Sequence, residues 1–159
     1  MATHRVTARV LPVSPDGAVL LLREQDPARR GEIYWASVGG AVDPGESLRE
    51  TAVRELLEET GIVVPPDDLV GPVHQLVDPF SWGGVAYVGD STYFAVRVPR
   101  DARVTFDRLE PEEIGNLLGA DWWRPEDLPD EVAVRPSGLR DIMRAAVAAI
   151  PPSRHGGEQ

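Results

Sequence analysis

Three glutamates near the middle of the chain, Glu55, Glu58 and Glu59, have a spacing that gathers carboxylates on one side of a helix. Residues i, i+3 and i+4 share a face of an α-helix. Like charges at this spacing destabilise an isolated helix by about 0.2–0.5 kcal/mol per pair, and anions in a last turn oppose the helix dipole. Hard divalent cations prefer carboxylate oxygens. The pattern therefore favours a metal site; for an isolated E-x-x-E-E the alternative is a solvated acidic face.

The surrounding residues predict a helix over 48–60 that would position these glutamates. Ser47 is a suitable N-cap, and Glu50, three residues later, completes a capping box. Gly61 is expected in the left-handed conformation just past the helix end. Arg54 lies four residues from both Glu50 and Glu58, so it can bridge them and hold Glu58 in position.

The wider pattern runs from Gly40 to Ile62 as GAVDPGESLRETAVRELLEETGI. It contains glycine, five residues, Glu46, seven residues, Arg-Glu-Leu, one residue, Glu-Glu, one residue and Gly-Ile. This pattern resembles the Nudix box, the signature of the Nudix hydrolase family, at every position. Val38 stands where many family members have proline before the glycine pair, a departure that removes no side-chain chemistry.

The resemblance implies hydrolysis of a diphosphate linkage in a nucleoside diphosphate attached to another group X, with Mg²⁺ or Mn²⁺ as cofactor. It implies metal binding by Glu55, Glu58, Glu59 and the backbone carbonyl of Gly39, and orientation of the catalytic helix by Arg54 and Glu46. One helix glutamate would help deprotonate the attacking water. Candidate substrates are nucleoside triphosphates, ADP-ribose and other nucleotide sugars, and dinucleoside polyphosphates.

Two other functions remain open. One is a sensor or scaffold that binds a nucleotide without cleaving it, which the complete set of box glutamates disfavours. The other is hydrolysis of a non-nucleotide diphosphate, such as a diphosphoinositol or an isoprenoid diphosphate. The shortage of basic residues near the box disfavours a highly phosphorylated inositol.

Composition limits the partners. The 159 residues suit one domain, predicted over 1–152, with a disordered tail over 153–159. A net charge of −10 argues against free-standing nucleic-acid or anionic-membrane binding. The absence of cysteine excludes disulfides and thiolate zinc sites, and the absence of lysine excludes a Walker-type P-loop. No signal peptide or long apolar run is present, so we expect a cytoplasmic protein, and the arginine-rich composition suggests a bacterial source.

The resemblance also implies an α/β fold, an α/β/α sandwich with a mixed sheet between the box helix and a C-terminal helix. Periodicity predicts a hairpin of strands over 5–13 and 18–23, and further strands over 33–38, 62–64, 69–77, 93–98 and the start of 120–128. Trp122 and Trp123 should then face opposite sides. The closing helix is expected over 136–150, with Ser137 as its cap.

Three aromatic residues are candidates for substrate binding: Phe80 and Trp82 in a loop expected over 78–84, and Trp35 in the strand before the glycine pair. Such rings can stack on a base or a sugar; the alternative is that they cover the sheet edge.

A second acidic patch, residues 110–113, follows far downstream of the box. Glu110, Glu112 and Glu113 are each candidates for an additional metal ligand or base. An exposed acidic turn is the alternative for each of them. The resemblance leaves the oligomeric state open, with a homodimer as one possibility.

Overall fold

The computed structural model describes residues 2–151. In chain order its elements are β1 (Thr3–Val13), β2 (Val19–Gln25), β3 (Ile33–Ala36), β4 (Val38–Ala41), α1 (Leu48–Thr60), the 3-10 helix η1 (Pro66–Asp68), β5 (Val70–Trp82), β6 (Val85–Arg97), β7 (Leu117–Trp123), the 3-10 helix η2 (Pro125–Asp127), β8 (Val134–Arg135) and α2 (Leu139–Ala149). The predicted tail lies outside the described residues. Within residues 2–151 no helix is both long and apolar enough to span a membrane.

All eight strands join one mixed sheet in the order β5-β6-β1-β2-β3-β8, with β4 beside β1 and β7 beside β2. β1 runs parallel to β6, and β3 runs parallel to β8. The predicted hairpin of β1 and β2 forms only at its tip, where Val13 pairs with Val19. Beyond the tip the two strands diverge, since β1 continues against β4 and β2 continues against β3 and β7. This divergence opens one end of the sheet.

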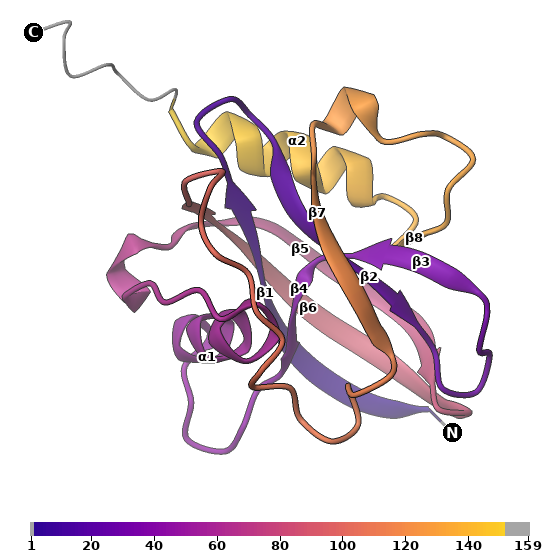
Figure 1. Cartoon of the computed structure of the whole chain (residues 1–159). Coiled ribbons are helices and arrows are strands. Elements are labelled where there is room, and N and C mark those ends of the chain that lie inside the picture. Colours follow the sequence, from indigo (N-terminus) through magenta and orange to yellow (C-terminus); the bar gives the residue numbers. More distant parts are fainter. Residues whose placement is uncertain (1, 152–159) are drawn as a thin grey trace, which may run out of the picture.

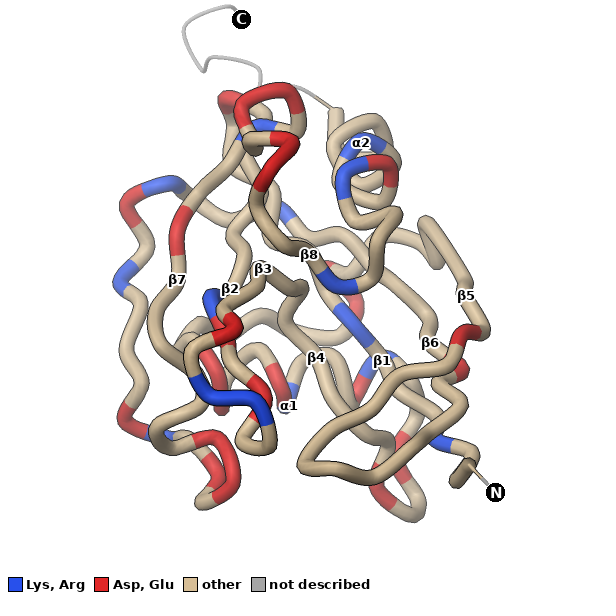
Figure 2. Tube along the Cα trace, turned by 90° about the vertical axis from the view of Figure 1, so that its right-hand side faces the viewer, with Lys and Arg blue, Asp and Glu red and all other residues tan. Residues whose placement is uncertain are grey.

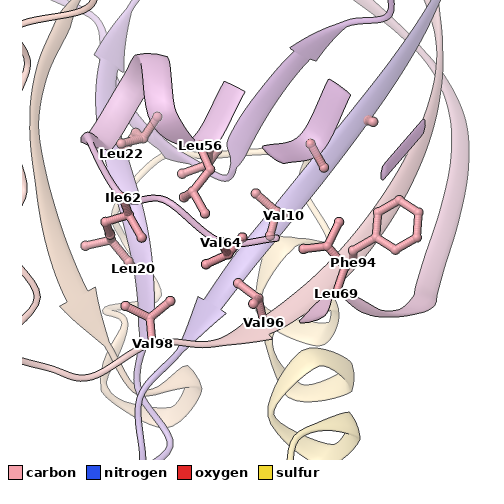
Figure 3. Close-up of a cluster of buried hydrophobic side chains, with 13 residues drawn as sticks. Val10, Leu20, Leu22, Leu56, Ile62, Val64, Leu69, Phe94, Val96 and Val98 are labelled. Carbon is pink, nitrogen blue, oxygen red and sulfur yellow. The ribbon is translucent and has the colours of Figure 1, made fainter. Parts of the chain in front are cut away.

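Each face of the sheet carries its own core, and a helix covers each face (Figure 1). Strand side chains alternate between the faces. On β1, Ala8 and Val10 therefore pack in the cluster that includes Leu56 of α1, whereas Leu11 and Val13 pack in the cluster of α2. Figure 3 shows the α1 cluster, built from β1, β2, β6, α1 and the segment after α1. The α/β/α sandwich is confirmed.

The box helix has the bounds that the sequence predicts. The Ser47 side chain accepts from the Glu50 backbone N–H, and the Glu50 side chain accepts from the Ser47 backbone N–H at 2.8 Å. Gly61 ends the helix with φ of 77°, and its N–H donates to the Leu57 carbonyl. Local sequence therefore fixes both ends of α1.

Several elements differ from the sequence prediction. The strand expected over 33–38 divides into β3 and β4, and β6 begins at Val85 and not at residue 93. Residues 62–64 form no strand; Ile62 and Val64 are buried as irregular chain over the α1 cluster, so their apolar character reflects packing. Residues 78–82 are the second half of β5, because proline is tolerated on an edge strand where its missing N–H faces solvent. The expected loop shrinks to a turn at Gly83 and Gly84, which have φ of 61° and 83°.

The closing helix begins at Leu139 and not at residue 136, and its N-cap is Gly138, with no side-chain cap, instead of Ser137. Its apolar stripe is buried as expected: Leu139, Ile142, Met143, Ala146 and Ile150. The two tryptophans of β7 face opposite sides, Trp122 toward the α1 cluster and Trp123 toward the α2 cluster.

Candidate active site

A cleft of about 710 Å³ is lined by the acidic residues of α1 and by side chains of several strands of the sheet. Side chains of β1, β5 and β6 line it on the sheet side, and β4, α1 and the loop before β7 close the other side. The residues around Arg135 and Ser137, between β8 and α2, complete the wall. The cleft therefore draws on segments from nearly the whole length of the chain.

Three carboxylates converge in this cleft. One oxygen each from Glu55, Glu59 and Glu113 lies within 4.8 Å of the others. Glu55 and Glu59 are neighbours on α1, and Glu113 comes from the loop before β7, where its carboxylate also accepts from the Glu110 N–H at 3.0 Å. Such an oxygen set, drawn from three side chains, fits a hard divalent cation.

The electrostatics of the cluster agree with a cation site. Burial raises the pKa of Glu55 to about 7, and nearby Glu58 and Glu113 add to that rise. Burial likewise raises the pKa of Glu59 well above its usual range, with contributions from Glu113 and Glu55. Packing like charges at low exposure is costly unless a counter-charge is present. A divalent ion would supply it.

Two glycines allow the chain of β4 to approach these carboxylates. The Gly39 N–H donates to Glu59 at 2.9 Å. A Cβ on Gly40 would lie 2.6 Å from Cδ of Glu55, a separation that real side chains do not adopt. The glycine pair thus holds Glu59 by its backbone and leaves room for Glu55. Gly39 lines the cleft, and metal binding by its carbonyl stays a prediction.

Arg54 ties the helix to the preceding loop. Its guanidinium binds Glu46 through two nitrogens, at 2.7 and 3.0 Å, and the Ala41 carbonyl at 3.0 Å. The third nitrogen reaches Glu55 at 3.0 Å and Glu58 at 3.2 Å. The Arg54 guanidinium lowers the pKa of Glu46 to about 2.

Part of this network differs from the sequence prediction. Arg54 pairs with Glu58 as expected but not with Glu50. The Glu50 carboxylate is engaged in the capping box. Glu46 takes its place as the second partner of Arg54. Sequence spacing alone could not show that the loop folds back along the helix.

The remaining acidic candidates lie at different distances from the carboxylate cluster. Glu58 lines the cleft beside the cluster but is not one of the three converging carboxylates. Burial raises its pKa, and Arg54 opposes that rise. Glu110 and Glu112 also line the cleft, at its rim, where both are exposed. Of the second acidic patch, the structure brings Glu113 alone into the cluster.

Two of the three aromatic candidates line the cleft, and the third does not. Phe80 and Trp82 line the cleft from β5, and the Phe80 ring stacks on Tyr87 with centroids 5.0 Å apart. Trp35 does not line the cleft, whereas Tyr34 and Ala36 on either side of it do; its ring meets Trp123 edge-on at 5.5 Å and packs against the α2 cluster. Alternation along β3 turns Trp35 away from the cleft, so this placement gives no support to a role of Trp35 in substrate binding.

Sequence reasoning missed six charged residues that line the cleft: Arg5, Arg9, Glu24, Asp43, Asp78 and Arg135. Burial raises the pKa of Glu24 to about 7, and Arg9 and Arg135 oppose that rise. The signal was present in β1, where polar residues alternate with apolar ones. The alternation does not tell whether the polar face meets solvent or a binding cleft.

A family model described as NUDIX domain matches residues 3–144. The chain belongs to the NUDIX domain family. A protein of Erythrobacter litoralis named RNA pyrophosphohydrolase is 29% identical over 91% of this chain and 88% of its own. One of the same name from Novosphingobium aromaticivorans is 27% identical over 80% of this chain and 81% of its own. As a Nudix protein with a complete set of box glutamates, the chain is an enzyme of the Nudix hydrolase class.

A solved structure agrees with the fold. The dihydroneopterin triphosphate pyrophosphohydrolase of E. coli is 18% identical, covers 93% of this chain and 99% of its own, and matches with a TM-score of 0.67. At this identity the likeness concerns the arrangement of the sheet and its two helices. The same fold thus recurs in a chain that shares few side chains with this one.

Proposed function

We propose that this Nudix protein hydrolyses the diphosphate linkage of a nucleoside diphosphate attached to a group X, with Mg²⁺ or Mn²⁺ as cofactor. The observation that carries the proposal is the convergence of Glu55, Glu59 and Glu113 within 4.8 Å at one end of a cleft. A diphosphate bears clustered negative charge and cannot bind bare carboxylates. A divalent ion between them neutralises charge on phosphate oxygens and activates water for attack.

The chain's own residues have separable roles in this proposal. Glu55, Glu59 and Glu113 would hold the ion, with Glu58 beside them at the cleft wall. Arg54 orients Glu55 and Glu58 and does so from a guanidinium fixed on Glu46. Because most catalysis of phosphoryl transfer is positioning and electrostatics, a rigid set of this kind supplies what the reaction needs.

The proposed substrate is a small nucleotide. We take residues 1–152 as the single domain that binds it. Phe80 and Trp82 are placed to contact its base or sugar. The relatives named RNA pyrophosphohydrolase make a 5′-triphosphorylated RNA a substrate to test. The net charge of −10 favours the small molecule, because binding along an RNA backbone draws on basic surface.

The test is release of phosphate or pyrophosphate with Mg²⁺ and then Mn²⁺. The panel contains nucleoside triphosphates, ADP-ribose, nucleotide sugars, dinucleoside polyphosphates and a 5′-triphosphorylated RNA. Glu58→Gln and Glu59→Gln should each lose turnover by at least about a hundredfold, since each removes a charge that the reaction uses. Glu126→Gln, an exposed position on η2 outside the cleft, is the matched control.

Circular dichroism and thermal unfolding would verify that each variant folds. Near-wild-type turnover in both Glu58→Gln and Glu59→Gln would refute the metal assignment. No turnover of any substrate, with nucleotide still raising the melting temperature, would indicate a nucleotide-binding module instead. Light scattering would show whether the protein is a dimer.

A further inference from the structure

The sheet side of the cleft carries a row of side chains from β1. Arg5, Thr7 and Arg9 alternate with apolar residues and line the cleft, because Ala8 and Val10 point to the α1 cluster. At about 3.3 Å per residue, the Cα atoms of the two arginines are about 13 Å apart along the strand. Figure 2 shows positive segments on β1, which pairs with β4 on one side and β6 on the other. Positive charge therefore follows the floor of a cleft whose wall is acidic.

Arg9 is the member of this row that lies beside the carboxylate cluster. In the ladder of β1 and β4 it is paired with Gly39, whose N–H binds Glu59. The aliphatic part of its side chain runs along that glycine, since a Cβ on Gly39 would lie 2.9 Å from Cδ of Arg9. Its charge also reaches the cluster: burial raises the pKa of Glu55, and Arg9 is among the residues that oppose the rise.

The cleft arginines differ from Arg54 in their partners. Arg54 pairs with four carboxylates within 4.0 Å. Over residues 2–151, by contrast, no carboxylate lies within that distance of the guanidinium of Arg5, Arg9 or Arg135. Arg9 has one long hydrogen bond, to the Ser37 carbonyl at 3.4 Å. Glu24 and Glu55 attract the half-buried Arg9 from beyond ion-pair distance, so its guanidinium donors remain available for phosphate oxygens, whose geometry they match.

We propose that Arg9 binds a phosphate group that adjoins the cleaved diphosphate, so that the preferred substrates have three or more consecutive phosphates. The inference rests on the proposed function, because it takes the carboxylate cluster as the place where the diphosphate is cleaved. A substrate whose X is an uncharged sugar would leave Arg9 without a partner. A nucleoside triphosphate or a dinucleoside polyphosphate would supply one.

The experiment compares wild type, Arg9→Gln, Arg9→Lys and Arg23→Gln. Arg23 is the matched control, an exposed arginine on the neighbouring β2 that does not line the cleft. Each protein is assayed with a nucleoside triphosphate and with the nucleoside-diphosphate sugar of the same base. In parallel, calorimetry measures the binding of inorganic tripolyphosphate and of pyrophosphate in the presence of Mg²⁺. Thermal unfolding checks that each variant folds.

We expect wild type to prefer the triphosphate. Arg9→Gln should lower kcat/KM for the triphosphate by about 10- to 100-fold, the range for a hydrogen bond to a charged group, mainly through KM. The same variant should lower kcat/KM for the nucleotide sugar by a factor at least about fivefold smaller, because the loss of positive charge near Glu55 affects both substrates and the loss of the phosphate contact affects only the triphosphate. Arg9→Lys keeps the charge but loses the paired donors of the guanidinium, so its kcat/KM for the triphosphate should lie between those of wild type and Arg9→Gln. Arg23→Gln should match wild type.

Two results would overturn the proposal: equal losses on both substrates, which would place Arg9 on the part they share, or no loss on either. If wild type cleaves neither substrate, the proposed function fails, and the binding measurement decides the role of Arg9. Tripolyphosphate should then bind wild type at least about tenfold more tightly than Arg9→Gln, with a smaller difference for pyrophosphate. Equal binding of tripolyphosphate by the two proteins would refute the inference.

Discussion

Replacing Gly40 with alanine tests whether the position of the Glu55 carboxylate matters to catalysis. A Cβ at residue 40 would lie 2.6 Å from Cδ and 2.9 Å from Oε1 of Glu55, against ordinary contacts of 3.4 Å or more. The backbone can accept alanine, because Gly40 is not among the glycines with positive φ. The three atoms nearest to that Cβ all belong to the Glu55 carboxylate, and the closest of them, Oε2, must move by about 1 Å to reach an ordinary contact.

Displacement of the Glu55 carboxylate should affect both kcat and the free energy of unfolding. Glu55 is 8% exposed and is held by Arg54 at 3.0 Å, so it cannot move without disturbing the pair. A misplacement of about 1 Å at a catalytic group can cost on the order of a hundredfold in rate. Overpacking of this kind destabilises a protein by about 1–3 kcal/mol. We expect Gly40→Ala to fold and to lose about a hundredfold in kcat.

The assay is steady-state hydrolysis of the best substrate of the wild-type protein, with urea unfolding of the same preparations. Gly138→Ala is the control, because a Cβ there meets nothing within 4 Å. If folded Gly40→Ala keeps kcat within about threefold of wild type, the carboxylate either is not displaced or does not contribute at its observed position. In either case the reasoning from the glycine to Glu55 would be wrong.

Two further predictions concern pH and the β5–β6 turn. The pKa of Glu55 is about 7 in the folded protein and near 4.5 in the unfolded chain, so the native state binds more protons between these pH values. Without divalent ions, the free energy of unfolding should therefore fall between pH 4.5 and pH 7, by on the order of 3 kcal/mol. Urea unfolding would measure this fall, which should be smaller in Glu55→Gln. The buried Asp26 carboxylate accepts hydrogen bonds from the N–H groups of Ala28 and Gly83 at 2.8 and 2.9 Å. Asp26→Ala should therefore lower the free energy of unfolding by about 1–3 kcal/mol. The same variant should raise KM more than it lowers kcat, because it loosens the end of β5 that bears Trp82.

Each of these predictions has a clear contrary outcome. If the metal-free protein gains stability between pH 5 and pH 7, then burial does not disfavour the charged form of Glu55. Asp26→Asn keeps an acceptor oxygen and is the control for the turn. An Asp26→Ala protein with unchanged KM and lowered kcat would indicate that the turn does not position the substrate-facing part of β5.

The sequence determined the features that depend on residues close together in the chain. The box helix has the predicted bounds because Ser47, Glu50 and Gly61 satisfy its end groups through contacts three or four residues long. The opposite faces of Trp122 and Trp123 followed from strand alternation, and the stripe on α2 followed from helix periodicity. The family pattern added the sandwich, because the box occurs with that fold.

The tertiary structure decided the features that depend on pairing between distant segments. Glu113 joins Glu55 and Glu59 because the loop before β7 lies against α1, which no local pattern specifies. The length of β5 depends on its partner β6 and on its place at the sheet edge, where proline is tolerated. Whether a strand's polar face meets solvent or a cleft depends on what stands opposite it, so only the folded chain shows that Arg9 lines the cleft and that Trp35 packs against the α2 cluster.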